Sequence, residues 1–285
     1  MPQQKTDTVK EFDFTKSDFE RVRALIYGRA GISLADSKQE MVYSRLARRL
    51  RATGIQSFTR YLDELEAGRM GAEWEAFTNA LTTNLTSFFR ESHHFPLLAD
   101  HLAALRRTDG APITIWCSAA STGEEPYSIA MTACEAFNTL TPPVKIIATD
   151  IDTNVLATGA NGVYPMERME KLDQARLKRF FLRGKGANEG MARVRPELRQ
   201  LVSFRQLNLL GEAWALEGQF DVLFCRNVMI YFDKDTQRKI LSRFVPLMKP
   251  HALLFAGHSE NFLYVSDALR LRGKTVYELD GRKPA

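Results

Sequence analysis

The stretch ITIWCSAASTGEEP, residues 113–126, joins a short apolar run to a turn and then to a helical pattern that continues to residue 137. A second apolar run at residues 144–149 precedes a second helical pattern at residues 153–160. Strands that alternate with helices in this order are typical of a parallel sheet with helices on both faces. The sequence therefore predicts a Rossmann-like α/β domain whose ligand site lies beyond the carboxyl ends of its strands.

The alternation continues towards the C-terminus and is interrupted once. Further strands are predicted at residues 202–204, 220–225 and 252–257, with a helix at residues 234–248. The interruption, about residues 162–206, combines one helical pattern (169–177), a glycine-rich turn (184–190) and three strand-like runs (179–183, 191–195 and 201–205). We predict a small inserted antiparallel β subdomain with an edge open to a peptide strand, or else a decorative insertion.

Residues 14–80 show a different pattern, that of short amphipathic helices. Their apolar residues recur at helical spacing, and Gly31 and Gly54 end the first two helices. Asp36 and Ser37 fit the N-cap of the second helix. We therefore predict an all-α N-terminal domain at residues 1–82, followed by the α/β domain at residues 83–285.

The composition excludes several classes of protein. Of the 285 residues, 45% are hydrophobic and 26% are charged, as in globular proteins rather than disordered or fibrous ones. No apolar run approaches the roughly 18 residues of a membrane helix, and no apolar secretory segment begins the chain. The three cysteines lack CxxC spacing and the five histidines lack ligand spacing, which argues against a metal site. We expect a cytoplasmic protein without a metal.

The net charge of +5 points to an anionic partner. Residues 41–62 contain no acidic residue and five arginines, namely Arg45, Arg48, Arg49, Arg51 and Arg60. A solvated helix side is the usual meaning of such a run of charge, and recognition of an acidic partner is the alternative.

The turn after the first predicted strand carries Glu124 and Glu125 and a single glycine, Gly123. A GxGxxG motif is absent, and two carboxylates at a helix start disfavour a pyrophosphate. They suit a cationic ligand, such as one with a free amino group or a sulfonium.

Asp150 ends the second predicted strand, about 30 residues after that turn begins. An acidic residue at this place commonly accepts hydrogen bonds from the hydroxyl groups of a ribose. The alternative is an N-cap for the next helix, which Asp152 or Thr153 could serve equally well. Adenosine with a cationic tail describes S-adenosylmethionine.

Two further segments place polar side chains near the same site. TNLTSFFR, residues 83–90, joins the two predicted domains and is rich in side-chain donors, including Arg90. FCRNVMIYF, residues 224–232, puts Arg226, Asn227 and Tyr231 beyond the carboxyl end of a strand. As a set, these residues indicate a functional site at the switch point of the sheet.

Five blocks occur in one order along the chain: TNLTSFFRE, CSAASTGEEPYS, ATDID, FDVLFCRNVMIYF and FAGHSENF. With them the chain resembles the chemotaxis receptor methyltransferases, the CheR family, which methylate glutamate side chains of bacterial chemoreceptors. The resemblance extends from about residue 14 to residue 278. It implies an all-α N-terminal domain followed by a Rossmann-like methyltransferase domain with a small inserted β subdomain.

The resemblance implies S-adenosylmethionine as the cofactor and S-adenosylhomocysteine as the product. It assigns Glu125 to the amino group of the methionine and Asp150 to the ribose. The other implied cofactor contacts are Asn84, Thr86 and Arg90 in the linker, Asn208 and Leu209 beside the adenine, and Arg226 and Asn227 on the pocket floor.

The resemblance also implies that the partners are the cytoplasmic domains of chemotaxis receptors, with recruitment to membrane receptor arrays but no membrane insertion. The residues assigned to substrate recognition are Arg45, Arg48, Arg49, Gly184, Gly186 and Gly190. The glycines lie in the insert, which in some relatives binds a receptor's C-terminal peptide; whether this chain does so stays open. Nothing demands more than a monomer.

The chemistry of this reaction needs no general base. A glutamate side chain has a pKa near 4.3 and is already a carboxylate at pH 7, and a methyl sulfonium is already an activated electrophile. We expect Arg90 and Tyr231 to position the carboxylates of substrate and cofactor. A nucleic-acid methyltransferase and a non-catalytic sensor of S-adenosylmethionine are the alternatives. The absence of an Asn-Pro-Pro-aromatic motif disfavours the first, and the intact TNLTSFFR block and Tyr231 disfavour the second.

Overall fold

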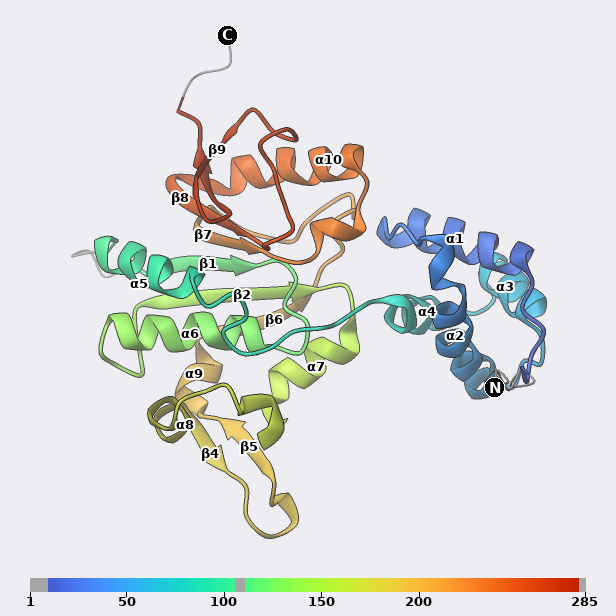
Figure 1. Cartoon of the computed structure of the whole chain (residues 1–285), viewed down its shortest axis with the longest axis horizontal. Helices are drawn as coiled ribbons and strands as arrows, with labels where there is room; N and C mark the ends of the chain where they lie inside the picture. Colours follow the sequence, from blue (N-terminus) through green and yellow to red (C-terminus); the bar gives the residue numbers. More distant parts are fainter. Residues whose placement is uncertain (1–9, 106–110, 282–285) are drawn as a thin grey trace, which may run out of the picture. The chain divides into compact units, whose positions relative to one another are not determined.

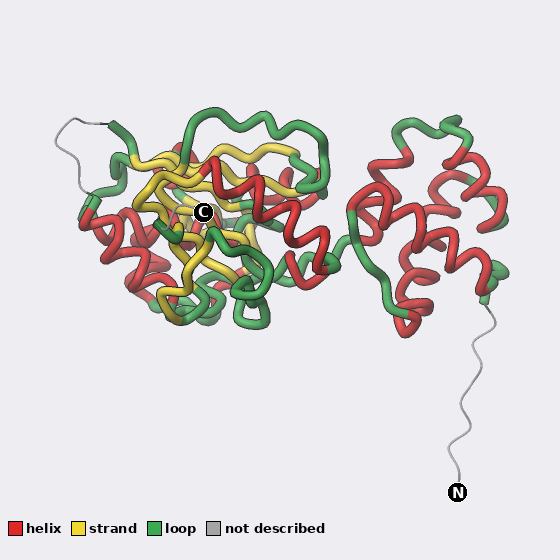
Figure 2. The backbone as a smooth tube through the Cα atoms, turned by 90° about the horizontal axis from the view of Figure 1, so that it is seen from above, coloured by secondary structure: helices red, strands yellow, loops and turns green. Residues whose placement is uncertain are grey.

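A computed structural model describes residues 10–105 and 111–281 of the chain. The chain folds into two compact units, Met1–Thr82 and Thr83–Ala285. In Figures 1 and 2 the first unit is helical in its described part, and the strands belong to the second unit. Each unit has its own core and is described by itself.

In its described residues, 10–82, the first unit packs four α-helices around buried apolar side chains. They are α1 (Lys16–Ala30), α2 (Gln39–Thr53), α3 (Phe58–Glu66) and α4 (Glu73–Leu81). Val22, Leu46 and Phe77 are fully buried, as the apolar spacing predicts. Gly31 and Gly54 follow α1 and α2 with left-handed backbone, which glycine adopts without strain, so both predicted helix ends are confirmed.

The predicted N-cap at Asp36 and Ser37 is wrong. Both residues lie in a short 3₁₀ turn, η1 (Asp36–Lys38), and Lys38 precedes α2 without a side-chain cap. The turn already satisfies backbone N–H groups, because Lys38 N donates to Ala35 O and Gln39 N donates to Asp36 O. An N-cap needs extended backbone, and a continuous helical turn does not offer it.

The second unit contains a seven-stranded sheet in the order β6-β2-β1-β7-β8-β10-β9. Five strands run parallel, as predicted: β1 (Ile113–Cys117), β2 (Val144–Asp150), β6 (Val202–Gln206), β7 (Phe220–Cys225) and β8 (Met248–Ala256). The chain moves outward from β1 through β2 to β6, and then crosses to β7 on the other side of β1. The switch point therefore lies between β1 and β7.

Helices cover both faces of this sheet. α5 (His94–Ala104) and α6 (Glu124–Ala136) lie on one side, and α10 (Lys234–Phe244) lies on the other (Figure 1). Alternate residues of β1 enter the two cores, because Ile115 and Cys117 join one apolar cluster and Trp116 joins the other. α7 (Thr153–Asn161) follows β2. No helix in the described ranges is long and apolar enough to cross a membrane.

The sheet also has an antiparallel extension that the sequence analysis missed. β9 (Leu269–Gly273) and β10 (Val276–Leu279) form a hairpin, and β10 pairs with β8. The hairpin turn contains Lys274 and Thr275, both with positive φ, and no Asn-Gly or Asp-Gly pair marks it in the sequence.

The inserted antiparallel sheet has the order β3-β5-β4, formed by β3 (Val163–Pro165), β5 (Met191–Val194) and β4 (Phe181–Arg183). Two predictions about it are wrong. The run at residues 201–205 belongs to β6, which pairs with β2 in the main sheet after the short helix α9 (Pro196–Gln200). The helix expected at residues 169–177 is replaced by η2 (Met166–Met169) and α8 (Gln174–Phe180), because Asp173 caps α8 by accepting from Arg176 N.

Candidate functional site

A buried ion cluster lies at the switch point, between the carboxyl ends of β1 and β7. Arg226 directly follows β7, and its guanidinium is fully buried. Its Nη1 donates to Oε2 of Glu125, at 2.6 Å, and its Nη2 lies 3.1 Å from Oε2 of Glu91. The same Nη2 donates to the backbone oxygen of Arg90, at 2.5 Å. Arg226 thus joins α6, the end of β7 and the linker block into one structure.

Glu125 keeps capacity to accept a further hydrogen bond. Burial raises the pKa of this carboxyl group, and the positive charge of Arg226 opposes that shift. Its second oxygen, Oε1, accepts from the thiol of Cys117 at 3.2 Å, which is a weak donor. A buried carboxylate in this state is suited to a cationic ligand, because an ammonium group supplies both charge and strong donors.

Asp150 is the second buried carboxylate of the site. Its oxygens accept the backbone N–H groups of Ser121, at 2.8 Å, and Asp152, at 3.0 Å. Burial raises its pKa. The alternative role as a helix N-cap belongs to Asp152 instead, which accepts from the backbone of Asn154 and Val155 at the start of α7.

The linker block lies over the carboxyl ends of β1 and β2. Asn84 Nδ2 donates to Asp152 Oδ2 at 2.8 Å, and the backbone oxygen of Asn84 accepts from Ser121 Oγ at 3.1 Å. Arg90 donates to the backbone oxygen of Leu85 at 2.6 Å, so its side chain folds back along the block. Thr86 lies between them and is half-buried.

The backbone around the cluster is strained. Four non-glycine residues of this region have positive φ, between 47° and 58°: Phe89, Glu91, Ser121 and Asn227. Such conformations cost roughly 1–3 kcal/mol each and persist where surrounding contacts hold them, which occurs most often at functional sites.

Glu260 holds the segment after β7 and was missed by the sequence analysis. Its buried carboxylate accepts the backbone N–H groups of Asn227, Val228 and Met229 at 2.7–2.9 Å, and that of Gly257 at 2.5 Å. A Cβ at Gly257 would lie 2.7 Å from the backbone nitrogen of Asn227, so this approach requires glycine. The signal was present in the block FAGHSENF, which contains both residues.

Tyr231 and Asn227 belong to the segment after β7, whose backbone Glu260 binds. Tyr231 ends the short 3₁₀ turn η4 (Met229–Tyr231) and is half-buried. The side chain of Asn227 donates to Oε1 of Glu91 at 3.1 Å. Asn227, Arg226 and Glu91 are therefore brought together, as a continuation of the ion cluster.

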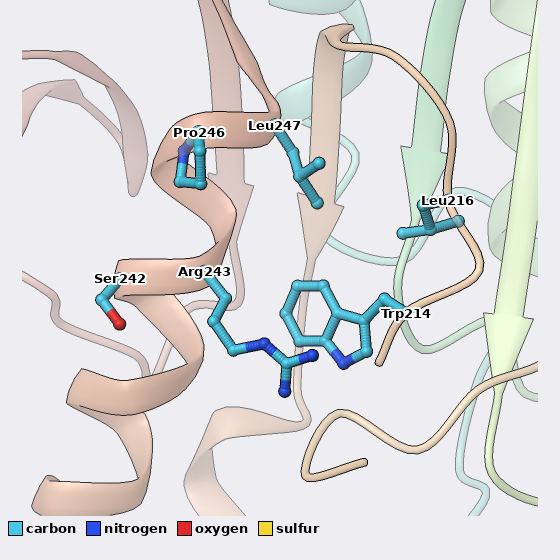
Figure 3. A pocket seen from close by; sticks show the side chains of 6 residues that line it. All are labelled: Trp214, Leu216, Ser242, Arg243, Pro246 and Leu247. Carbon is cyan, nitrogen blue, oxygen red and sulfur yellow. The ribbon is translucent and has the colours of Figure 1, made fainter. Parts of the chain in front are cut away.

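Asn208 and Leu209 follow β6, and a side chain of α10 is hydrogen-bonded to this segment. Asn208 Oδ1 accepts from Leu210 N at 2.9 Å, while Leu209 is buried in the core. Arg243 of α10 donates to the backbone oxygens of Leu209 and Gly211, at 3.4 and 2.7 Å. Its guanidinium also stacks on the indole of Trp214, 3.8 Å from the ring centre, at the edge of the pocket in Figure 3. The sequence analysis did not predict these contacts of Arg243.

The three glycines of the insert shape the turn between β4 and β5. A Cβ at Gly184 would lie 2.0 Å from the backbone oxygen of Asn188, which excludes any other residue there. Gly186 and Gly190 have φ values of 59° and 80°. Their glycine identity is therefore explained by the hairpin itself.

The three arginines of α2 that were assigned to substrate recognition have different surroundings. Arg49 forms a bidentate pair with Glu73 at 2.7 and 2.8 Å, and the hydroxyl of Tyr61 donates to the same carboxylate. Arg45 donates to the backbone oxygens of Ala80 and Thr82 at the end of α4. Arg48 is exposed.

The residues at the carboxyl ends of the strands fit an adenosine-containing cation. Asp150 can accept from ribose hydroxyls beside its two backbone bonds, because each carboxylate oxygen has more than one acceptor position. Glu125 can accept from an ammonium group at Oε1, because Arg226 occupies Oε2 and the present donor to Oε1 is the weak thiol of Cys117. No group of metal-ligating side chains occurs within the described part of the chain.

Comparison with known proteins identifies the two units. Residues 17–82 match the family described as CheR methyltransferase, all-alpha domain, and residues 84–277 match CheR methyltransferase, SAM binding domain. The second description confirms the predicted cofactor, S-adenosylmethionine.

Similar proteins cover nearly the whole chain. Chemotaxis protein methyltransferase 2 of Pseudomonas aeruginosa is 56% identical over 268 residues, which cover 94% of this chain and 95% of that protein. The chemotaxis protein methyltransferase of Escherichia coli is 55% identical over 261 residues, or 92% of this chain and 90% of that protein. A probable chemotaxis protein methyltransferase of Rhizobium etli is 39% identical over 83% of this chain and 89% of its own length. The chain therefore belongs to the CheR methyltransferase family, as the five sequence blocks predicted.

Proposed function

We propose that this methyltransferase transfers the methyl group of S-adenosylmethionine to glutamate side chains of chemotaxis receptors, forming the methyl esters used in sensory adaptation. The similarity to chemotaxis protein methyltransferases over more than nine tenths of the chain supports the pathway. The observation that supports the proposed mechanism is the ion cluster of Arg226, Glu125 and Glu91. Arg226 is committed to Glu125 and Glu91, so Arg90 and Tyr231 are the groups left to orient a substrate carboxylate.

The residues of this site hold and align, and they do not need to remove a proton. When bound, S-adenosylmethionine supplies a methyl group on a sulfonium, which an ionised carboxylate attacks in line without a general base. Orientation of such reactants can lower the barrier by roughly 7–11 kcal/mol. His94, beside the cluster, is a poor base in any case. Burial and the nearby charge of Arg226 lower its pKa to about 4, and its Nε2 lies 2.9 Å from the backbone oxygen of Lys274.

Each cofactor-binding role follows from a local contact pattern. Glu125 binds the methionine ammonium, and Asp150 binds the ribose hydroxyls. Asn208 and Leu209 border the adenine, on the segment that Arg243 clamps. The remaining proposed cofactor-binding residues lie in the linker and at the end of β7, namely Asn84, Thr86, Arg90, Arg226 and Asn227. Arg226 acts through Glu125, because its own side chain is fully buried.

Transfer of labelled methyl from S-adenosylmethionine to receptor-bearing membranes tests this function. We expect label on a receptor band and its release as methanol by brief alkali, because carboxyl methyl esters are base-labile. Label on nucleic acid, or cofactor binding without label on any of several receptors, would contradict the proposal.

The Arg90→Ala variant tests the proposed catalytic group. Turnover should fall by about 100-fold or more, since a charged orienting contact is lost. Cofactor affinity and the unfolding transition, followed by calorimetry, check that the site is otherwise intact. Wild-type turnover with unchanged cofactor affinity would remove Arg90 from the mechanism.

The helical unit recognises the acidic receptor helix in this proposal, with Arg48 as an exposed cation of α2 and the half-buried Arg45 and Arg49 on the same helix. Arg48 and Arg49 form a matched pair for testing. Arg48→Glu should raise the receptor KM and weaken its salt dependence at unchanged stability. Arg49→Glu should instead destabilise the helical unit, because it places a second carboxylate beside the buried Glu73. An unchanged receptor KM in Arg48→Glu would contradict recognition by this face.

The β subdomain offers the edge of β4, next to the turn of Gly184, Gly186 and Gly190, to a receptor's C-terminal peptide. Strand addition needs an unpaired edge, and β4 pairs with β5 on one side in a sheet of three. Titration with receptor tail peptides, with a Gly184→Val variant as a control, tests this arrangement.

We propose that the enzyme works as a cytoplasmic monomer recruited to receptor arrays.

A further inference from the structure

Several large apolar side chains are exposed in the segments that border the site. Tyr264 is 89% exposed, Leu85 is 78% exposed, Ile230 is 49% exposed and Leu263 is 41% exposed. They account for half of the large hydrophobic residues found exposed among the described residues. Large apolar groups gathered at a functional edge mark an interaction surface more often than chance exposure does.

Leu85 and Ile230 lie on opposite sides of the switch point. The backbone oxygen of Leu85 accepts from Arg90, and its neighbour Asn84 is bonded to the loop after β1. Ile230 lies in η4, directly after the β7 end and next to Tyr231. The proposed catalytic groups, Arg90 and Tyr231, therefore each have an exposed apolar side chain beside them.

Leu263 and Tyr264 extend the same border to the next strand. They follow β8, the neighbour of β7, in the segment that begins at Gly257. Glu260 of this segment binds the backbone of residues 227–229, so the segments after β7 and β8 are joined. The exposed apolar residues thus span the carboxyl ends from the β1 side to β8.

We infer that Leu85, Ile230, Leu263 and Tyr264 form an apolar collar that binds the receptor helix carrying the acceptor glutamate. The inference rests on the proposed function, and it names the surface by which that site holds its substrate. An amphipathic helix presents apolar residues three and four positions from a given glutamate, on the same face. Such a helix could place its carboxylate at the site while these apolar neighbours contact the collar.

The charge of the site favours an apolar contact with the substrate helix. The buried Glu125 and Asp150 and the half-buried Glu91 are three carboxylates, against the two guanidiniums of the buried Arg226 and the half-buried Arg90. A site of this formal charge does not by itself attract an acidic helix. Burial of apolar area supplies an attraction that is independent of the sign of the charge.

The test compares a collar variant, Leu85→Ser/Ile230→Ser/Tyr264→Ser, with Leu271→Ser as a matched control. Leu271 is 39% exposed on β9, the edge strand of the main sheet, two strands from β8. We expect the collar variant to raise the KM for a receptor fragment by about tenfold or more. The control should stay within about twofold of wild type. Cofactor dissociation constant, kcat at saturating receptor and thermal unfolding should be unchanged in both variants.

Each other outcome has a defined meaning. A receptor KM within about twofold of wild type in the collar variant overturns the collar, as does a selective loss of cofactor affinity, which would make these residues cofactor contacts. A loss of thermal stability in the collar variant would show that the residues pack within the protein, and it too overturns the inference. If the wild-type protein labels no receptor, the proposed function itself is wrong, and the collar falls with it.

Discussion

Strand β7 carries a buried charge near each of its ends, and the two ends differ in how that charge is satisfied. Near the amino end, Asp221 accepts from Lys249 Nζ, His251 Nε2 and both the backbone and hydroxyl groups of Thr114, at 2.7–3.0 Å. Burial alone would raise its pKa, but these donors lower it to about 2. At the carboxyl end, Arg226 faces Glu125, whose pKa burial raises.

The difference separates a structural charge from a ligand-binding one. Asp221 has its acceptor positions filled from within the chain, so its charge stabilises the fold. Glu125 and Asp150 are also buried but accept fewer hydrogen bonds than Asp221 does, and burial raises the pKa of both. Acceptor positions without a donor from the chain lower the stability of the fold, but the same positions can accept hydrogen bonds from a ligand.

Replacement of Arg226 by methionine should have the largest effect on stability, and it tests the carboxyl end of β7. It leaves the buried Glu125 and the half-buried Glu91 without their cation, so the free energy of unfolding should fall by about 3 kcal/mol or more. Urea denaturation measures the loss, and cofactor binding should disappear with it. The double variant Arg226→Met/Glu125→Gln should regain part of the stability but no cofactor binding. Equal stability of Arg226→Met and wild type would show that the cluster is not charge-balanced as described.

The Asp221→Asn variant tests the amino end of β7, where the buried charge stabilises the fold. Loss of the charge should lower the free energy of unfolding by about 2 kcal/mol, because the ion pair with Lys249 and the bond from His251 are both weakened. The cofactor dissociation constant, measured by calorimetry, should stay unchanged. A loss of cofactor affinity at wild-type stability would reverse the assignment of the two ends.

The pH dependence of stability sharpens the same contrast. The pKa of His94 falls from 6.5 in the unfolded chain to about 4 in the fold, so protonation favours unfolding. Stability should therefore be complete above pH 6.5 and decrease by about 2 kcal/mol between pH 6.5 and 5. Asp221 adds a second loss from about pH 4 towards its folded pKa of about 2, because its carboxylate form is the stabilised one.

Denaturant titrations at stepwise pH measure both losses. A His94→Gln variant serves as the control, since glutamine at this position does not titrate. The loss between pH 6.5 and 5 should become smaller in the variant, with a remainder from His101, whose pKa burial also lowers. An unchanged slope in that variant would assign the upper loss to another residue.

The smallest expected effect is that of Asp150→Asn at the ligand-binding end. Cofactor affinity should fall about tenfold, or about 1.4 kcal/mol, because the amide is a poorer acceptor for ribose hydroxyls than a carboxylate is. The free energy of unfolding should fall by about 1 kcal/mol, because the amide NH2 group replaces one of the two oxygens that accept the backbone N–H groups of Ser121 and Asp152. A larger loss of stability than in Asp221→Asn would contradict the division between the two ends.

Several elements of the fold were predictable because their signals are local. The apolar runs of β1 and β2, the glycines that end α1 and α2, and the helix after Glu124 depend on residues close together in the chain. The hairpin of β9 and β10 was missed because its strands are short and alternate little. β6 was placed in the insert as well as in the main sheet, because a strand's partner is not encoded in its own five residues.

The site was predictable as a set of residues but not as a set of contacts. Arg226, Glu125, Asp150 and Asn227 were named from their blocks, whereas Glu91, Glu260 and Arg243 were not given roles. The glutamates lie inside matched blocks, yet nothing in their sequence surroundings says which backbone groups they bind. Arg243 acts on a segment more than 30 positions away.

The sequence by itself determined the class of fold, the family and the cofactor, because periodicity and ordered motifs are read along the chain. Tertiary structure alone decided the partner of each charge. Arg48 and Arg49 are neighbours on one helix, yet one is exposed and the other pairs with Glu73. Arg226 meets Glu125 across 101 positions. Electrostatic roles depend on distance and burial in space, and only the packed sheet and helices establish those quantities.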